Sequence, residues 1–261
     1  MYLRIYDMRF FLFLIALLFT LHLGAQNNTG EILYVDKINI HKGLPPEMEA
    51  MKERIPEFRE SKKILYFNPE ETLYINKPRD ASDQQTQREF QGEGRRRGGR
   101  FGRNNSDNKF YTDLKNSTSV DSRNFFGKDF LIEGSRSALK WKITGEQKQV
   151  GSFLCQKATY QDTTQSIVAW FTPMIPVSSG PDDFFGLPGM ILHMDIDDGL
   201  RQITANDISL KELEAGLIVR PTKGKKVTDV EFRKLREEKT KEMEEEFGGR
   251  RGGGRFFRRG G

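Results

Sequence analysis

The sequence is poor in the residues that carry most enzyme chemistry. It has one cysteine, Cys155, and three histidines, of which His22 lies in an N-terminal apolar stretch. A single thiol excludes an intramolecular disulfide, so packing must hold the fold together, and a lone cysteine is by default a small buried apolar residue. The GxSxG, HExxH and paired CxxC patterns of serine hydrolases, zinc proteases and dithiol oxidoreductases are missing.

Long apolar runs are also scarce. The one present, Phe10 to Leu23, follows Arg4 and Arg9 and ends in Leu-Gly-Ala-Gln. A basic start, a short apolar segment and small residues at its end are typical of a secretory signal peptide, which we assign to residues 1–25. The run is short for a bilayer span, and a retained anchor is the alternative. The sequence thus predicts an exported protein, periplasmic, on the outer envelope or secreted.

Apolar residues make up only 36% of the sequence and charged residues 30%. The net charge of +5 is concentrated, because two Gly-rich tracts, 95–103 and 250–259, contain five arginines each. The segment 79–108 has too little apolar surface to offset the entropy of ordering, so we expect a disordered insertion there and a disordered tail at 248–261. The rest divides into a β domain, 26–220, and a charged helix, 221–247.

Short runs rich in β-branched and aromatic residues recur along the β domain and predict an antiparallel sheet. The expected strands are residues 31–40, 63–68, 72–76, 110–111, 130–133, 139–144, 151–160 and 167–171. Pro-Glu-Glu between the second and third indicates a hairpin, and Gly145 to Gln149 a turn. Apolar residues at helical spacing favour a short helix near 46–60, and Thr228 to Glu231 forms a capping-box pattern at the start of the charged helix.

The register of one further hairpin follows from its turn. If Asp198 and Gly199 form a two-residue turn, His193 pairs with Thr204, and one face of the hairpin becomes apolar. Arg201 is the exception on that face.

Residues 169–192 are the most constrained stretch of the chain. Four prolines alternate with three glycines, so fixed φ angles lie beside permissive ones. Leu187-Pro188-Gly189-Met190 is typical of a type II turn. The pattern predicts a shaped loop that leads into a strand.

The same stretch carries a family resemblance. Residues 186–191, Gly-Leu-Pro-Gly-Met-Ile, preceded by Ala-Trp at 169–170, Ile-Pro-Val-Ser at 175–178 and Gly-Pro at 180–181, resemble the hallmark of the GLPGLI family of secreted bacterial proteins. Gly151 and Cys-Gln-Lys-Ala at 155–158 are similar to that family's pattern too. The resemblance implies an envelope or secreted location in a Gram-negative bacterium. It implies no established activity and no catalytic residue.

We expect the loop to lie against one end of a curved sheet or incomplete barrel, with its aromatic residues, Phe184 among them, around a concavity. Concave, partly apolar sites are where proteins hold ligands, so the leading hypothesis is a non-catalytic module that binds an apolar or amphipathic ligand or an envelope protein. The candidate loop residues are Trp170, Phe171, Pro173, Pro176, Gly180, Pro181, Phe185, Gly186, Leu187, Pro188 and Gly189.

Two enzyme alternatives stay open. His193, Asp195 and Asp197 share one strand face and could bind a divalent cation, although a polar outer face is the ordinary state of a strand. Cys155 could act as a nucleophile with His193, although packing is its commoner role. No catalytic residue, metal or cofactor is assigned.

The Arg/Gly tracts offer a third possibility. With Phe101, Phe256 and Phe257 they resemble RNA-binding segments, but export argues against RNA as a partner. The same charge would attract anionic lipids or glycans, or remain solvated beside the acidic face of the helix.

Overall fold

The computed structural model describes residues 28–78 and 108–250. The predicted signal peptide, nearly all of the predicted disordered insertion, and residues 251–261 of the tail lie outside the described residues. Across the described ranges, no helix is both long enough and apolar enough to cross a membrane.

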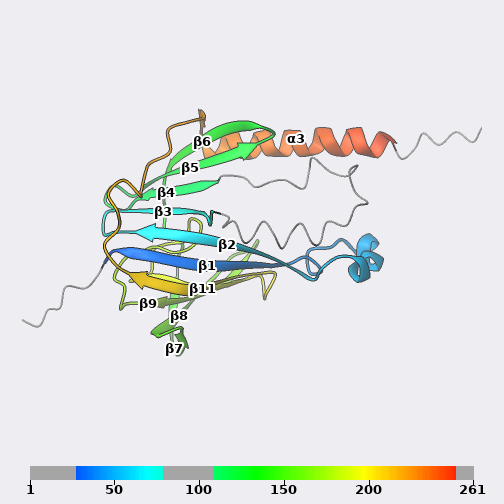
Figure 1. The fold of residues 1–261 in the computed structure, drawn as a ribbon. Coiled ribbons are helices and arrows are strands. Elements are labelled where there is room, and N and C mark those ends of the chain that lie inside the picture. The colour runs from blue at the N-terminus through cyan, green and yellow to red at the C-terminus, as the bar shows by residue number, and fades with distance from the viewer. Residues whose placement is uncertain (1–27, 79–107, 251–261) are drawn as a thin grey trace, which may run out of the picture.

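The fold is mainly β, as predicted, with one large open sheet of 12 strands (Figure 1). The strands are β1 (Gly30–Asn39), β2 (Phe58–Phe67), β3 (Glu71–Asn76), β4 (Lys109–Asp113), β5 (Thr118–Phe125), β6 (Lys128–Ser135), β7 (Lys142–Val150), β8 (Phe153–Gln161), β9 (Ser166–Thr172), β10 (Met190–Ile196), β11 (Arg201–Leu210) and β12 (Lys225–Val227). Two helices accompany them within the described chain, the 3-10 helix η2 (Pro46–Arg54) and α3 (Asp229–Arg250).

The sheet consists of two meanders. Strands β1 to β6 follow one another through one half, and β7 to β11 through the other. The halves join where β1 pairs antiparallel with β11. The sheet is mostly antiparallel, as predicted, and among the described strands the parallel pair lies at one edge, where β12 pairs with β6. The chain reaches that edge through residues 211–224, a crossing that a short hairpin turn could not make.

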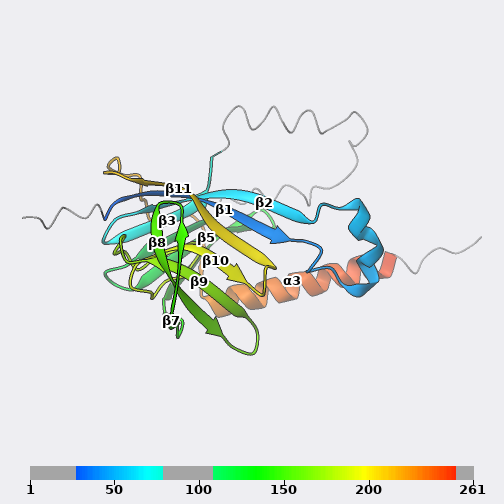
Figure 2. The same ribbon diagram turned by 90° about the horizontal axis from the view of Figure 1, so that it is seen from below.

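The sheet curls and encloses one face. In Figure 2, β8, β9 and β10 lie across β1, β3 and β5, and buried side chains of both halves, such as Tyr34 and Phe171, belong to one apolar cluster. The loop 173–189 completes this cluster, because Ile175 and Leu187 are buried in it. The loop is therefore part of the core as well as part of the surface.

Two predicted hairpins are confirmed. Leu65 of β2 lies opposite Tyr74 of β3. In the β10–β11 hairpin His193 lies opposite Thr204, as the two-residue turn required. Asp198 adopts a positive φ of 51° in that turn, a conformation that aspartate tolerates better than most residues.

The strand expected at 139–144 is confirmed only from Lys142 onward, and the turn expected at 145–149 is wrong. Strand β7 begins only at Lys142 and runs through both, with an irregular register between Ile143 and Gln147. Leu139 and Trp141 do pack against the core, but the indole Nε1 of Trp141 donates a hydrogen bond to the Phe185 carbonyl at 2.8 Å. Their apolar alternation therefore reflects contact with the loop, and Ile143 is 48% exposed.

Both helices differ from their predicted form. The short helix is 3-10 and ends at Arg54, just before Pro56, and α3 begins and ends later than predicted. The capping box is confirmed: the Glu231 amide donates to Thr228 Oγ1 at 3.2 Å, and the Thr228 amide to Glu231 Oε2 at 2.7 Å. Phe232 is only 3% exposed and packs near the start of the helix. Figure 1 shows α3 continuing past β6, consistent with the weak docking predicted for it.

Candidate functional site

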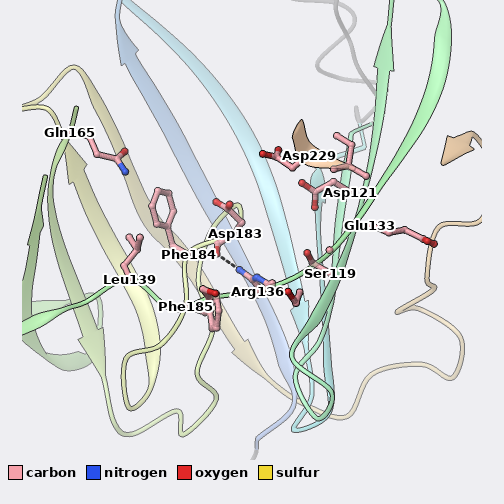
Figure 3. Close-up of a pocket in the computed structure, with 14 residues that line it drawn as sticks. Ser119, Asp121, Glu133, Arg136, Leu139, Gln165, Asp183, Phe184, Phe185 and Asp229 are labelled. Atoms are coloured by element: carbon pink, nitrogen blue, oxygen red, sulfur yellow. Dashed lines mark hydrogen bonds between the residues drawn. The ribbon is translucent and has the colours of Figure 1, made fainter. Parts of the chain in front are cut away.

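A pocket of about 460 Å³ opens where the loop tip meets the β5–β6 edge of the curled sheet (Figure 3). Its walls come from β5, β6 and the segment after it, the loop tip and the first residue of α3. The lining residues are Ser119, Asp121, Ile132, Glu133, Gly134, Ser135, Arg136, Ser137, Leu139, Gln165, Asp183, Phe184, Phe185 and Asp229.

The loop contributes three consecutive side chains to the pocket, those of Asp183, Phe184 and Phe185. Their backbone is fixed: the Phe184 amide donates to the Pro181 carbonyl at 3.2 Å, and Trp141 holds the Phe185 carbonyl. Figure 3 shows Phe184 on one side of the pocket and Asp121 across from it. Both phenylalanine rings are half-buried, so each keeps surface that a ligand could contact.

Asp121 is the most perturbed carboxyl of the pocket. Its side chain is 15% exposed and receives a hydrogen bond from Arg123 Nη2 at 3.1 Å. Burial, opposed by Arg123 and reinforced by the nearby Asp183 carboxylate, raises the pKa of Asp121 to about 6. At neutral pH part of the population is protonated, so this carboxyl can donate as well as accept a hydrogen bond.

Arg136 is the cation of the pocket. Its Nη1 donates to Thr112 Oγ1 at 2.6 Å, its Nη2 donates to the Asp183 carbonyl, and its guanidinium lies 4.1 Å from the centre of the Phe185 ring. Burial lowers the pKa of Arg136, and the Asp183 and Asp121 carboxylates partly restore it. Arg136 thus joins the sheet to the loop tip.

Glu133 lines the pocket but directs its side chain elsewhere. Figure 3 shows that side chain pointing away from the cavity, and its carboxylate pairs with Lys226 at 3.2 Å. The pocket therefore presents three carboxylates, those of Asp121, Asp183 and Asp229.

A charge cluster anchors the loop just before its tip. Asp36 of β1, 3% exposed, accepts two hydrogen bonds from Arg201 at 2.9 and 2.7 Å and lies 2.8 Å from Lys63 Nζ. Asp182 of the loop pairs with the same two cations, at 2.5 Å from Arg201 and 3.4 Å from Lys63. Although burial raises it, the Arg201 and Lys63 cations lower the pKa of Asp36 overall. The tip is thus tied to β1, β2 and β11 by four buried or half-buried charges. Tyr74 lies beside them, and its hydroxyl is buried without a hydrogen-bond partner.

The predicted loop residues divide between core and surface. Those buried are Phe171, Gly180, Pro181, Leu187 and Gly189, and those exposed are Pro173, Pro176, Gly186 and Pro188. Of the eleven, only Phe185 lines the pocket. Trp170 alternates with buried Phe171 along β9 and so lies on the opposite face, where Lys148 Nζ is 4.4 Å from its ring centre. Of the aromatic residues expected to fill or rim a concavity, Phe171 fills the apolar interior of the curled sheet and Phe184 and Phe185 line the pocket, whereas Trp170 does neither.

The predicted type II turn is also wrong. The Leu187 carbonyl accepts the Gly189 amide at 2.8 Å, and the Met190 amide donates instead to the Ile175 carbonyl at 3.0 Å. A Cβ at position 189 would lie 2.1 Å from the Thr172 carbonyl oxygen, so the glycine permits a close backbone approach. Ser178 does bond the loop's own backbone, since its Oγ accepts the Gly186 amide at 3.1 Å.

The aspartates of the possible cation site instead form hydrogen bonds that stabilise the β10–β11 hairpin and join it to the start of β9. Asp195 accepts the Gly199 amide at 2.6 Å and the Gln202 side chain at 2.8 Å, and Asp197 accepts the Ser166 amide at 2.9 Å. Within the described residues, no group of three or more His, Cys, Asp or Glu side chains is placed to hold a metal ion. Nothing in this geometry supports the metal alternative.

Neither member of the possible thiol dyad is activated. Cys155 is fully buried, and burial raises the pKa of its thiol to about 11. Burial and the Lys148 charge lower the pKa of His193 to about 4, and its Nδ1 lies 2.8 Å from Thr204 Oγ1. Neither residue lines the pocket.

Sequence reasoning missed Asp121, Arg136 and Asp229 as site residues, because their strand and helix positions read as ordinary polar ones. It also gave no role to Asp182, whose positive φ of 53° turns its carboxylate back to the sheet cations. The available signals were Arg201 and Asp36, each on an otherwise apolar strand face, since a charge there needs a buried partner.

Comparison with known proteins gives little beyond the fold. A family model of bacterial proteins, described as a protein of unknown function (Porph_ging), matches residues 161–193, which include the loop. No curated protein matches the chain. Two solved structures of PNGF-II, in space groups C2 and P21, are similar at TM-scores of 0.53 and 0.52 and identities of 13% and 14%. Each match covers 79% of this chain and 32% of the PNGF-II chain, so this chain spans about a third of the length of PNGF-II. At this identity the likeness concerns the fold alone.

Proposed function

We propose that this protein is an exported, non-catalytic binding module of a bacterial envelope, and that its ligand occupies the pocket at the loop tip. The observation that carries the proposal is the difference in burial between the base of the loop and its tip. Its residues 175–181 and 187 are mostly buried, whereas residues 183–185 all face the cavity. A loop anchored at its base and open at its tip is preorganised to hold a ligand.

The pocket has the make-up of a ligand site. It is concave, it combines aromatic rings with a few polar groups, and it contains a carboxyl with a raised pKa. The non-catalytic reading rests on the buried thiol of Cys155 and on His193, which is hydrogen-bonded and far from ionising. The resemblance to the GLPGLI family is part of the same proposal, and its motif lies inside the segment that the family model matches.

The pocket is tested by removing a ring that faces it. The protein is purified from its native envelope and studied by native mass spectrometry as wild type, Phe184→Ala and Phe58→Ala. Phe58 is 39% exposed at the start of β2 and is the matched control. A bound species should accompany wild type and Phe58→Ala and be lost from Phe184→Ala. A species that stays bound to Phe184→Ala would place the site elsewhere.

Export has its own test. Cleavage of the signal peptide should leave Gln26 as the first residue, which N-terminal sequencing of the envelope fraction would detect. An intact Met1 in that fraction would support a retained anchor instead.

A further inference from the structure

We infer that the pocket takes a neutral saccharide of one or two units, held by hydrogen bonds to its hydroxyls and by one sugar face against Phe184. This inference rests on the proposed function, since it names the ligand class of the same pocket.

The first argument is the supply of uncommitted polar groups. Within the described residues, the Ser119 hydroxyl, the side-chain amide of Gln165 and the Asp183 and Asp229 carboxylates line the pocket without a hydrogen bond or ion pair of their own. Figure 3 shows these four around one cavity. They comprise acceptors and groups that both donate and accept, which is what a ligand with many hydroxyls requires.

The second argument is charge. Among the residues that line the pocket, the carboxyl groups of Asp121, Asp183 and Asp229 are accompanied by one cationic side chain, that of Arg136, and Asp121 also pairs with Arg123. An anionic ligand would meet three carboxylates, and Arg136 is already committed to Thr112 and the Asp183 carbonyl. The described residues provide no group of ligands for a metal ion. A neutral polar ligand is not repelled by the carboxylates and needs no metal ion to hold it.

The third argument is shape. The half-buried Phe184 ring offers an apolar surface beside the polar groups, and the apolar C–H face of a sugar ring packs on such a surface while its edge hydroxyls reach outward. The volume of about 460 Å³ lies within the roughly 300–1,000 Å³ of small-molecule sites. The carboxyl of Asp121, protonated in part of the population at neutral pH, can serve a hydroxyl as donor or acceptor.

The experiment uses the exported chain and defined probes. Neutral mono- and disaccharides of hexose and N-acetylhexosamine units, a sulfated disaccharide, a lysine-rich peptide and an apolar fluorescent dye are each titrated by calorimetry. Saturation-transfer NMR then tests whether the bound probe contacts aromatic protons. The variants are Phe184→Ala and the exposed, conservative Asp183→Asn, with Phe58→Ala as control and circular dichroism to verify folding.

The expected result is binding of a neutral saccharide that weakens at least tenfold in Phe184→Ala and measurably in Asp183→Asn, and is unchanged in Phe58→Ala. Binding of the peptide, the dye or the sulfated sugar alone, with the same dependence on Phe184, would overturn the saccharide inference and leave the pocket as the site. Absence of binding by every probe, or binding indifferent to Phe184 and Asp183, would overturn the saccharide inference and count against the pocket itself.

Discussion

Two charged side chains interrupt the apolar faces of neighbouring strands, and they are each other's partners. Asp36 follows Ile32 and Tyr34 on the buried face of β1, and Arg201 precedes Ile203 on that of β11. Considered alone, each is a charged residue that interrupts the apolar positions of an alternating strand. Together they form the bidentate pair that, with Lys63 and Asp182, holds the loop to the sheet.

Removing Arg201 should therefore be costly. Arg201→Met leaves Asp36 and Asp182 with Lys63 as their only cation, and we expect a loss of about 3 kcal/mol in the free energy of unfolding, measured with urea. The double variant Asp36→Asn, Arg201→Met retains a balanced Lys63–Asp182 pair and should be less destabilised than the sum of the single variants by more than about 1 kcal/mol. Strict additivity would contradict the cluster.

The titration of Asp121 makes the free energy of unfolding depend on pH. Its pKa of about 6 in the folded chain lies above its ordinary value of 3.8, so the folded chain keeps a proton that the unfolded chain releases. Stability from this group is full below pH 4 and is lost as pH rises to about 6, a change of about 2–3 kcal/mol. Asp121→Asn cannot titrate, so its stability relative to wild type should rise across that window and stay level above pH 7. Urea unfolding at pH 4, 5, 6 and 7.5 measures the difference, and a constant difference would be incompatible with the raised pKa.

Among the elements, α3 is attached near its start, through Phe232 and Leu235. Phe232 meets Phe130 of β6 and Phe125 of β5 edge-on, with ring centres 5.5 and 5.8 Å apart. The capping box fixes where the helix starts but adds no contact with the sheet. The helix is thus held to the sheet near its N-terminal end.

Phe232→Ala should detach α3 and spare the sheet. Amides of α3 should lose most of their protection in hydrogen exchange, while those of β1 and β11 keep theirs. The conservative Phe232→Leu should retain most of the docking. Loss of protection throughout the sheet would show that α3 belongs to the cooperative core.

Elements were predictable from sequence where local chemistry decides them. The Asp198-Gly199 turn sets the β10–β11 register, and Thr228 with Glu231 sets the start of α3. Prediction failed where distant contacts decide: Leu139 and Trp141 alternate because the loop covers them, and Gly189 is required by Thr172 in the neighbouring strand. The local sequence does not distinguish such contacts from the packing of an ordinary strand or turn.

At the scale of the whole molecule, the mainly β class and the single sheet followed from the spacing of apolar runs. The strand order did not, because nothing local distinguishes β1 beside β11 from β1 at an edge. The parallel pairing of β12 was missed for the same reason, since three residues carry no alternation. The pocket is a product of this topology: Asp121 and Arg136 belong to the β5–β6 hairpin and the residue after it, and the curl of the sheet brings Asp183 of the loop to them.

The insertion 79–107 connects β3 to β4, which pair directly, so it should be dispensable for folding. Replacing it with a four-residue Gly/Asn-rich turn should preserve the circular dichroism spectrum and, because a shorter loop costs less entropy to close, raise the unfolding free energy by about 1–2 kcal/mol. A Gly/Ser segment of the native length is the control. Failure of the shortened chain to fold would mean that the insertion contributes to the domain.

The pairing of β1 with β11 determines the order in which the strands of the sheet can form. A ribosome releases β1 to β6 first, and this meander can form while β11, which begins only at Arg201, is still unmade. Until then β1 is a bare edge with Ile32 and Tyr34 uncovered, and such an edge recruits other chains. Among the described strands, β1–β11 and β12–β6 join those that are farthest apart in sequence, and slow steps in folding come from such pairs. The nascent protein is thus most prone to aggregation after β1 to β6 have formed and before β11 pairs with β1.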